Sequence, residues 1–310
     1  MIARVASVEP AIEVRDLRKS YGGLEAVRGI EFTVRRGEIY GLLGPNGAGK
    51  TSTVEILEGY RERTSGEVSV LGFDPDNRPR ELRARVGIVL QSSGIYNYAS
   101  VAELLDHFAH FYPHPRDVDE VIDLAGLSEK RDARARTLSG GQRRRLDLAL
   151  ALVGDPELVF LDELTTGLDP HARHAMWDLV RDVRSRGKVV FLTTHFMEEA
   201  EVLCDRVAIV DHGKIVALDT PARLIAGLGG GHRVVFAADD DVSGLMQGLE
   251  GVRLVEKISQ RTIVGGDGDM LVVNVVTALV KAGVRFRDLR TEQPKLEDVF
   301  LALTGREMRD

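Results

Sequence analysis

Short apolar runs that lead into polar residues recur through the first 220 residues of the chain. Three of them are residues 38–43, 157–161 and 188–194. Such runs are typical of strands that are buried on both faces of a parallel sheet. Residues 100–111 and 117–127 have helical spacing instead. The pattern predicts an α/β domain in which buried strands and helices share one core.

The C-terminal part has a different pattern, which begins after four glycines within residues 227–231. Strands and helices are predicted there in the order β-α-β-β-α-β, at residues 233–237, 242–249, 252–257, 262–265, 271–282 and 284–289. This order is typical of a ferredoxin-like α+β unit. Because a glycine run makes a flexible joint, we expect a division into residues 1–226 and 227–310.

A glycine-rich stretch follows the apolar run at residues 38–43 and leads into a helical segment. It reads Gly44, Pro45, Asn46, Gly47, Ala48, Gly49, Lys50 and Thr51. The stretch fits the phosphate-binding P-loop, G-x-x-x-x-G-K-[ST], in which glycines let backbone N–H groups close around an anion. Lys50 supplies a charge to the β and γ phosphates, and Thr51 a hydroxyl for Mg²⁺. A turn without a ligand is the simpler alternative, but the strand before the loop and the helix after it favour nucleotide binding.

Polar side chains follow three other predicted strands. Gln91 comes after residues 85–90, the pair Asp162 and Glu163 after residues 157–161, and His195 after residues 188–194. The carboxyl ends of parallel strands present ligand-binding groups at one edge of the sheet. Asp162 suits Mg²⁺ held through water, and Glu163 suits a base or orienting group for the water that attacks a γ phosphate. A lone Gln or His is no evidence of a site, so the prediction of a common site rests on the position that these residues share after a predicted strand.

A second candidate anion site opens the helix that follows residue 139. Ser139, Gly140, Gly141 and Gln142 precede a long apolar-faced segment. The Ser139 hydroxyl and exposed backbone N–H groups, which are expected to point outward together, and the positive end of a helix dipole favour an anion there. In isolation the same residues are a good N-cap. The basic run at residues 143–145 is an ordinary solvated or ion-paired helix face, or else a nucleic-acid patch.

Composition narrows the classes of function. The formal charge of 41 − 48 = −7 excludes a basic field over the whole molecule that would recruit nucleic acid. One cysteine, Cys204, cannot form an internal disulfide, and the first residues show no signal-peptide pattern. No run reaches the roughly 20 apolar residues of a membrane span. We therefore expect a cytosolic chain that needs a separate partner for any membrane role.

Over residues 10–225 the sequence resembles the ATPase subunit of ABC transporters. The resemblance rests on the P-loop (Walker A), Gln91, residues 138–142, residues 158–163 (Walker B), residues 166–169 and His195. It implies a P-loop NTPase cassette with a RecA-like α/β core, an antiparallel β subdomain and a helical subdomain. It also implies a homodimer that sandwiches two ATP molecules, with the P-loop of one copy facing Ser139 of the other.

The resemblance assigns a role to each matching residue. Glu163 and His195 are catalytic, Tyr21 stacks on adenine, Asp169 couples the two sites, and Gln91 senses Mg²⁺ and contacts the membrane partner. The residues expected at ATP are Tyr21, Gly44, Pro45, Asn46, Gly47, Ala48, Gly49, Lys50, Thr51, Ser52, Gln91, Ser139, Gly140, Gly141, Gln142 and Asp169. The residues expected at Mg²⁺ are Thr51, Gln91 and Asp162. One departure is Leu164, where the family usually has proline, so the turn beside Glu163 is expected to be looser.

The C-terminal tail resembles the ends of ATPase subunits from daunorubicin-resistance-type exporters, whose accessory domain is thought to aid dimer assembly or regulation. The resemblance implies an ATPase at the inner face of the cell membrane that drives a separate multi-span permease, without nucleic acid, and exports a drug, antibiotic or lipid-like cargo. Leu296, Val299, Phe300 and Leu303 form one helical face there, which docks either on its own domain or elsewhere.

Two other functions stay open. The first is a soluble ABC-type switch that acts on DNA or ribosomes. Only one cassette is present, however, no long coiled-coil insertion separates Lys50 from Ser139 (139 − 50 = 89 positions), and no basic tail is found. The second is the ATPase of an importer, against which only the tail argues.

Overall fold

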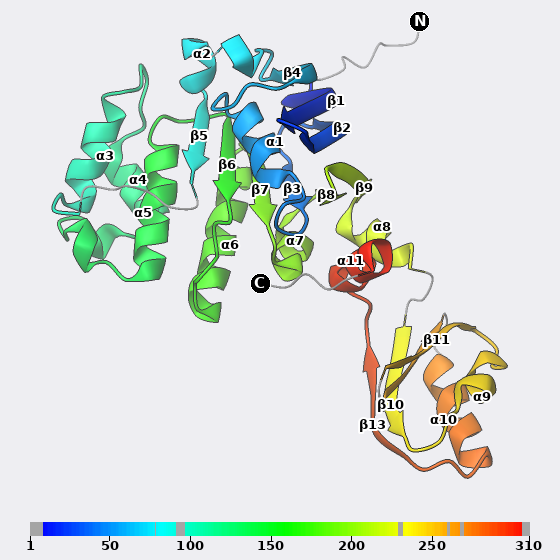
Figure 1. Ribbon diagram of the computed structural model, residues 1–310. Coiled ribbons are helices and arrows are strands. Elements are labelled where there is room, and N and C mark those ends of the chain that lie inside the picture. Colours follow the sequence, from blue (N-terminus) through cyan, green and yellow to red (C-terminus); the bar gives the residue numbers. More distant parts are fainter. Residues whose placement is uncertain are drawn as a thin grey trace, which may run out of the picture. The chain divides into compact units, whose positions relative to one another are not determined.

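The computed structural model describes residues 9–77, 79–90, 97–228, 232–258, 261–266 and 270–305. The chain folds into two compact units, and the boundary between them lies between Thr220 and Pro221 (Figure 1). No helix in these ranges has the length and apolar composition needed to cross a membrane.

A six-stranded sheet forms the centre of the first unit. Its order is β5-β6-β7-β3-β8-β9, and only β9 runs antiparallel to its neighbour. The strands are β3 (Ile39–Leu43), β5 (Val86–Val89), β6 (Leu158–Asp162), β7 (Val189–Thr194), β8 (Arg206–Asp211) and β9 (Lys214–Asp219). Gly41 lies in the middle of β3, where an added Cβ would lie 2.7 Å from the buried Cys204 sulfur. The lone cysteine is therefore packed directly against the sheet.

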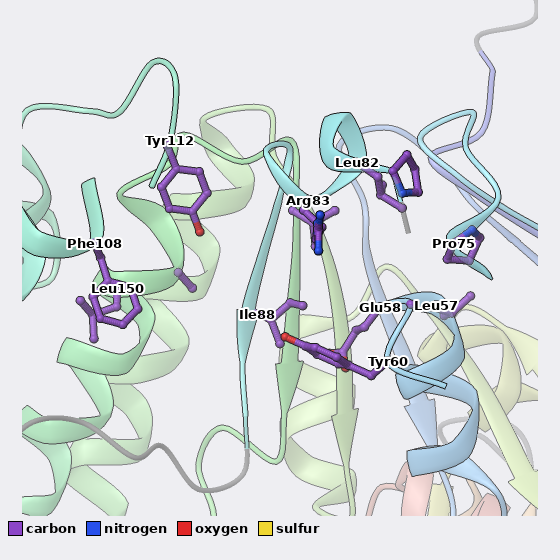
Figure 2. Close-up of a pocket in the computed structure, with 14 residues that line it drawn as sticks. Leu57, Glu58, Tyr60, Pro75, Leu82, Arg83, Ile88, Phe108, Tyr112 and Leu150 are labelled. Atoms are coloured by element: carbon purple, nitrogen blue, oxygen red, sulfur yellow. The ribbon is translucent and has the colours of Figure 1, made fainter. Parts of the chain in front are cut away.

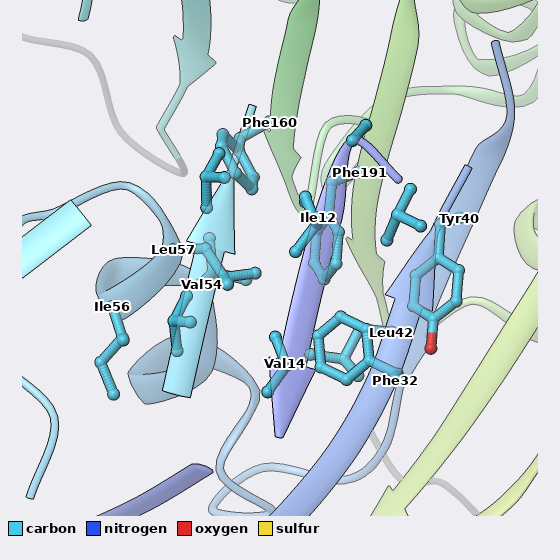
Figure 3. Packing of buried hydrophobic residues seen from close by; sticks show 14 of the residues in the cluster. Ile12, Val14, Phe32, Tyr40, Leu42, Val54, Ile56, Leu57, Phe160 and Phe191 are labelled. Carbon is cyan, nitrogen blue, oxygen red and sulfur yellow. The ribbon is translucent and has the colours of Figure 1, made fainter. Parts of the chain in front are cut away.

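A three-stranded antiparallel sheet packs against this centre in the order β2-β1-β4. Its strands are β1 (Ile12–Tyr21), β2 (Leu24–Val34) and β4 (Ser65–Val70). The two sheets share one apolar cluster, in which Phe32 stacks on Tyr40 at 5.3 Å and Tyr40 on Phe191 at 5.6 Å between ring centroids (Figure 3). Burying aromatic side chains from both sheets fixes the antiparallel sheet beside β3, from which the P-loop starts.

Helices complete the first unit. They are α1 (Lys50–Leu57), α2 (Arg80–Arg83), α3 (Val101–Ala109), α4 (Val118–Leu124), α5 (Gly140–Leu152), α6 (Pro170–Ser185) and α7 (Met197–Leu203), with short 3₁₀ turns η1 (Pro75–Asn77), η2 (Ser128–Lys130) and η3 (Ala135–Thr137). α3, α4 and α5 bury their own apolar cluster, which includes Leu104, Val121 and Leu146. Ser100 begins α3 with a capping box completed by Glu103. These three helices form the expected helical subdomain.

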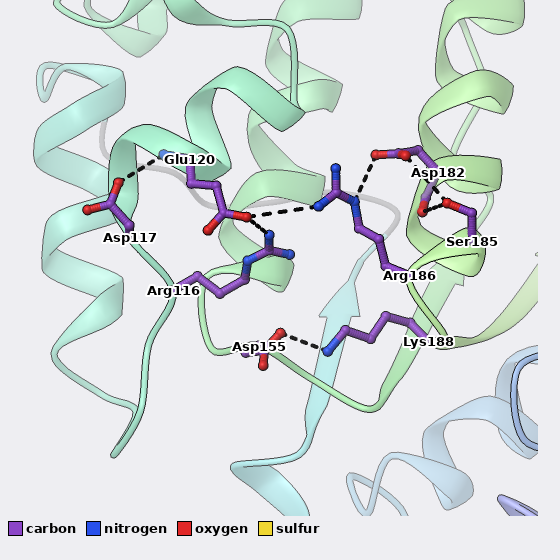
Figure 4. Close-up of polar contacts among 8 residues, drawn as sticks. All are labelled: Arg116, Asp117, Glu120, Asp155, Asp182, Ser185, Arg186 and Lys188. Atoms are coloured by element: carbon purple, nitrogen blue, oxygen red, sulfur yellow. Dashed lines mark hydrogen bonds and ion pairs between the residues drawn. The ribbon is translucent and has the colours of Figure 1, made fainter.

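Ion pairs connect α4 to α6 (Figure 4). Glu120 of α4 pairs with Arg116 and lies 3.9 Å from Arg186, which follows α6 and pairs with Asp182 at 3.0 Å. Nearby, Lys188 pairs with Asp155 at 2.7 Å. The helical subdomain is thus linked to the end of α6 by charged side chains.

The second unit contains a four-stranded antiparallel sheet in the order β11-β12-β10-β13. Its elements are α8 (Pro221–Ala226), β10 (His232–Ala238), α9 (Ser243–Gln247), β11 (Val252–Ile258), β12 (Arg261–Gly266), α10 (Leu271–Lys281), β13 (Phe286–Glu292) and α11 (Leu296–Thr304). Phe236, Met246, Val275 and Leu279 belong to the core that α9 and α10 form with the sheet. Strands and helices follow the predicted β-α-β-β-α-β order.

The last helix, α11, docks on its own unit. Leu296, Val299 and Phe300 are buried, α11 contacts α8, and Asp298 pairs with Arg233 of β10. Leu303, expected on the same buried face, is 47% exposed. Because α8 packs with α11, the division falls six residues before the predicted boundary between residues 226 and 227.

Candidate functional site

The P-loop connects β3 to α1, and only glycine fits at two of its positions. An added Cβ at Gly44 would lie 2.2 Å from the carbonyl oxygen of Val210. Gly49 has φ 101°, and its Cβ would lie 2.5 Å from the carbonyl oxygen of Ala26. Left-handed backbone and close packing both require a residue without a side chain. The loop is therefore held tightly between β8 and β2, with α1 beginning at Lys50.

Lys50 is enclosed by the loop that it ends. Its side chain donates hydrogen bonds to the carbonyl oxygens of Gly44 (2.6 Å) and Pro45 (3.2 Å), and the residue is only 7% exposed. Burial lowers the pKa of its ammonium group, while the nearby carboxylates of Glu163 and Asp162 oppose that shift. A cation in this position is ready to pair with phosphate oxygens.

The carboxyl ends of β6, β7 and β3 meet at one edge of the sheet. The register pairs Asp162 with Thr193, and Thr194 with Leu43, the residue before the P-loop. Thr193 Oγ1 donates a hydrogen bond to Asp162 Oδ1, which fixes the carboxylate beside the loop. The structure thus brings Asp162, Glu163 and His195 together with the P-loop, as the sequence predicted.

Glu163 and His195 face each other at this edge. His195 Nδ1 lies 3.3 Å from Glu163 Oε1, and both side chains are mostly buried. Glu163 adopts a left-handed backbone with φ 47°, which is uncommon outside glycine and costs about 1–2 kcal/mol. Its N–H donates to the carbonyl oxygen of Thr193 at 3.1 Å, so the strained turn is tied to β7. Backbone strain of this kind is typical of functional sites.

The oxygen donors at this edge fit Mg²⁺. Asp162 offers a carboxylate and Thr51, in the first turn of α1, offers a hydroxyl, which are the ligand types that Mg²⁺ prefers. When bound with a nucleotide, the ion would neutralise charge on the phosphate oxygens. Gln91, the third predicted metal residue, lies outside the described residues.

The Ser139 motif is built as a helix cap. Ser139 Oγ accepts from the Gln142 N–H at 3.3 Å, and Gln142 Oε1 accepts from the Ser139 N–H at 3.0 Å. Both side chains are therefore engaged in a capping box, as the simpler interpretation held, rather than aimed outward. The N–H groups of Gly140 and Gly141 belong to the first turn of α5, where backbone donors have no intrahelical acceptor. An anion would be held there by the backbone.

Two further predicted residues lie at element ends. Asp169 caps α6 by accepting from the Ala172 N–H at 2.9 Å. Tyr21 ends β1, is partly exposed, and its hydroxyl lies 3.0 Å from Ser52 Oγ. The Lys19 ammonium lies 5.1 Å from the centre of the Tyr21 ring. A Tyr21 ring beside the first turn of α1 is compatible with stacking on a base, which stays a prediction.

A separate pocket of about 520 Å³ lies between α1, α2 and β5 on one side and α3 and α5 on the other (Figure 2). Its walls are mainly apolar, with Leu82, Ile88 and Phe108 among them. Glu58 contributes a carboxyl group whose Oε1 atom is buried without a hydrogen-bond partner among the described residues. Burial, reinforced by the charges of Asp162 and Glu55, raises the pKa of Glu58 to about 8. The pocket thus combines apolar walls with one buried carboxyl group.

Comparison with known proteins identifies the family. Residues 27–166 match the ABC transporter family. The Nod factor export ATP-binding protein I of Rhizobium meliloti (strain 1021) is 42% identical over 307 residues, which cover 97% of this chain and 90% of that protein. The chain belongs to the ABC transporter family. The protein of the same name from Burkholderia orbicola (strain AU 1054) is 41% identical over 98% of this chain and all of its own length.

Solved structures agree with this assignment to the ABC transporters. CbiO1 from Clostridium perfringens, part of the ABC transporter complex cbiONQ, has a TM-score of 0.65 at 27% identity over 70% of this chain and 91% of its own. The ATP-binding cassette MJ0796, solved as a dimer with ADP and Pi, has a TM-score of 0.60 at 21% identity over 67% and 98%. At that identity MJ0796 supports the fold alone. The predicted cassette fold is confirmed, and this ABC subunit is an ATP-hydrolysing subunit of a transporter that binds ATP with Mg²⁺, as its family does.

Two residues of this ABC subunit were missed by the sequence motifs. Arg144, expected on a solvated or ion-paired helix face, binds backbone carbonyls of the turn at Glu163. Glu199 is buried in α7, and its Oε1 accepts from Thr165 Oγ1 (2.8 Å) and Trp177 Nε1 (3.1 Å). Burial raises the pKa of Glu199. Charged residues near the apolar runs gave no signal of these contacts, because their partners lie 18 or more positions away.

Proposed function

We propose that this ABC subunit powers a membrane exporter by ATP-driven closure and reopening of a homodimer. The observation that carries the proposal is the meeting of Lys50, Asp162, Glu163 and His195 at one sheet edge. Export as the direction is supported by the name of the similar proteins, which are Nod factor export ATP-binding proteins. The resemblance of the C-terminal tail to daunorubicin-resistance-type exporters adds a drug, antibiotic or lipid-like cargo to the proposal.

The proposed hydrolysis assigns one task to each group. Lys50 pairs with β and γ phosphate oxygens, and His195 holds the γ phosphate. Glu163 accepts the proton of the attacking water as the new bond to the γ phosphorus forms and the bond to the leaving ADP oxygen breaks. The contact between His195 Nδ1 and Glu163 Oε1 keeps the Glu163 carboxylate oriented. Tyr21 stacks on adenine in this proposal, and Asp169 couples the two sites.

The proposed dimer makes each nucleotide site composite. The backbone N–H groups after Ser139 in one copy complete the phosphate site around Lys50 of the other copy. Support comes from the cap itself, because each of its two side chains accepts from the backbone N–H of the other residue, which leaves the N–H groups of Gly140 and Gly141 to a ligand. A single copy then has only half of each site, and hydrolysis requires pairing.

The proposed membrane partner is a separate multi-span permease, which places this subunit at the inner face of the membrane without nucleic acid. We assign its contact to the pocket of Figure 2. The pocket includes Val86 and Ile88 of β5, the strand that leads to Gln91, for which the family resemblance implies contact with the membrane partner. An apolar segment with one hydrogen-bond donor for Glu58 fits such a surface.

The experiment that tests the site compares two variants in the purified chain with ATP and Mg²⁺. Glu163→Gln should keep ATP affinity and slow turnover by about 10²–10⁴-fold, since a general base is lost. Lys50→Ala should abolish ATP binding. Near-normal turnover of Glu163→Gln would refute the catalytic role, and unchanged ATP affinity of Lys50→Ala would refute the P-loop site.

The transport proposal has its own test. The full chain, tagged and purified from membranes, should retain a multi-span protein, and its ATP hydrolysis should change when that protein is present. Recovery of ribosomes or DNA in its place would overturn the exporter proposal in favour of a soluble switch. Uptake, rather than efflux, of the partner's cargo in membrane vesicles would assign an importer.

A further inference from the structure

One arginine of α5 contacts the turn that carries Glu163. Arg144 is the fifth residue of the helix, and its side chain is 11% exposed. Its Nε donates to the carbonyl oxygen of Leu164 at 2.8 Å. Its Nη2 donates to the carbonyl oxygens of Asp162 at 3.2 Å and Glu163 at 3.1 Å. A single guanidinium thus binds three consecutive carbonyls.

The same guanidinium reaches a third segment. Its Nη1 donates to the carbonyl oxygen of Leu90 at 2.8 Å and lies 3.5 Å from Asp147 Oδ2. Leu90 directly follows β5 and precedes Gln91. Arg144 therefore joins the start of α5, the end of β5 and the turn after β6.

Such a contact has an energetic reason. Glu163 is held at φ 47°, a conformation that is strained for a residue with a side chain. Hydrogen bonds from a charged donor are stronger than those between neutral groups. Three such bonds from Arg144 therefore oppose relaxation of the strained turn. Leu164 does not fix its own φ as a proline would, and a hydrogen bond to its carbonyl oxygen helps to hold the turn.

We propose that Arg144 is a positioning residue, which holds Glu163 for hydrolysis and relays to it the position of the helix that begins after Ser139. This inference rests on the proposed role of Glu163 as the base. Because α5 carries both the Ser139 motif and Arg144, engagement of that motif by the other copy's nucleotide would be transmitted, within one chain, to the turn at Glu163.

The neighbouring arginines provide matched controls. Arg143 binds Asn97 Oδ1 at 2.7 Å, and Arg145 lies 3.5 Å from the carbonyl oxygen of Gly126. Arg145 thus ties the same helix to a backbone carbonyl, but away from the turn at Glu163. Replacing Arg145 removes an equal charge from α5 and keeps the contacts of Arg144.

The test measures ATP hydrolysis and ATP binding of the full chain. Arg144→Gln should lower kcat by about 10–100-fold, as expected for a misplaced catalytic group, with KM and ATP affinity within about twofold of the unchanged chain. Arg144→Lys, which keeps the charge but has a single donor group, should recover part of kcat. Arg145→Gln should keep kcat within about twofold. Equal losses in Arg144→Gln and Arg145→Gln, or a rise in KM without a fall in kcat, would overturn the proposal.

A double-mutant cycle with Glu163→Gln tests whether Arg144 acts through Glu163. If Arg144 acts through Glu163, Arg144→Gln should add little to the loss that Glu163→Gln already causes. Losses that multiply would overturn the proposal, whereas near-normal turnover of Glu163→Gln alone would instead refute the role of Glu163. Arg144→Lys gives the same cycle if Arg144→Gln does not fold.

Discussion

Glu58 shows how a single residue reports on its surroundings. Its carboxyl lies in the wall of the pocket in Figure 2, and burial raises its pKa to about 8. The unfolded chain ionises this group near its ordinary pKa of 4.5, well before the folded chain does. The folded chain therefore binds more protons between these two values, and Glu58 lowers stability progressively as the pH rises from about 4.5 to 8.

We accordingly expect Glu58→Gln to stabilise the chain in a pH-dependent way. Each pKa unit corresponds to about 1.4 kcal/mol, so the variant should gain roughly 4 kcal/mol in free energy of unfolding at pH 8 and little at pH 4.5. Denaturant unfolding at the two pH values measures the difference. Glu67→Gln, on an exposed strand position, is the control. A gain that is the same at both pH values would mean that Glu58 is not a buried titrating group.

At the residue scale, the sequence revealed the functional groups that lie next to one another along the chain. The P-loop and the acids after β6 are contiguous, so residue types and spacing were enough to find them. Arg144 and Glu199 act on atoms that only the fold brings near, such as Leu164 and Thr165. In the sequence, a charged residue beside an apolar run looks the same whether its side chain contacts water or a strained turn in the folded chain.

At the scale of secondary-structure elements, the packing of α11 leads to a testable prediction. Phe300 is buried in the contact of α11 with its unit, whereas Leu303 on the same helix is half exposed. Phe300→Ala should destabilise the second unit by about 3–5 kcal/mol, and Leu303→Ala by less than about 0.5 kcal/mol. Limited proteolysis of the full chain would show cleavage after Thr220 in the first variant, with ATP binding retained. Equal resistance of both variants would show that Phe300 does not hold α11 in place.

The elements themselves followed their patterns closely. The strands β3, β6 and β7 lie within a residue or two of the predicted apolar runs, because buried strands must be apolar on both faces. Strand β13 begins at Phe286, two residues after the predicted start. In β1, bulges in the pairing with β2 break the alternation that sequence patterns detect.

For the whole molecule, the proposed composite site predicts nucleotide-dependent pairing. Glu163→Gln with ATP and Mg²⁺ should have the mass of two chains by light scattering, compared with 34.1 kDa for one chain. Adding Ser139→Arg should return it to one chain, because a bulky cation breaks the cap and blocks the N–H groups after it. Ser128→Arg, an exposed position outside the site, should leave the pair intact. Pairing that survives Ser139→Arg would place the interface elsewhere.

At this scale the sequence predicts two units that divide between residues 226 and 227, whereas the compact units of the structure divide between Thr220 and Pro221. The glycine run drew the boundary to residue 227, whereas α8 precedes that run and packs with α11, some 70 residues further along. A contact between distant helices leaves no local signal. Cargo and permease are likewise chosen by surfaces whose counterparts lie in other chains.

Cys204 has a practical consequence that follows from its place under β3. Its thiol is buried against Gly41, and burial raises the pKa of the thiol well above its usual range. A thiolate is the form that reacts with maleimides and oxidants, so this sulfur is unreactive in the folded chain. A fluorophore or spin label attached to one newly introduced surface cysteine would consequently report from that place alone, without first removing the native one.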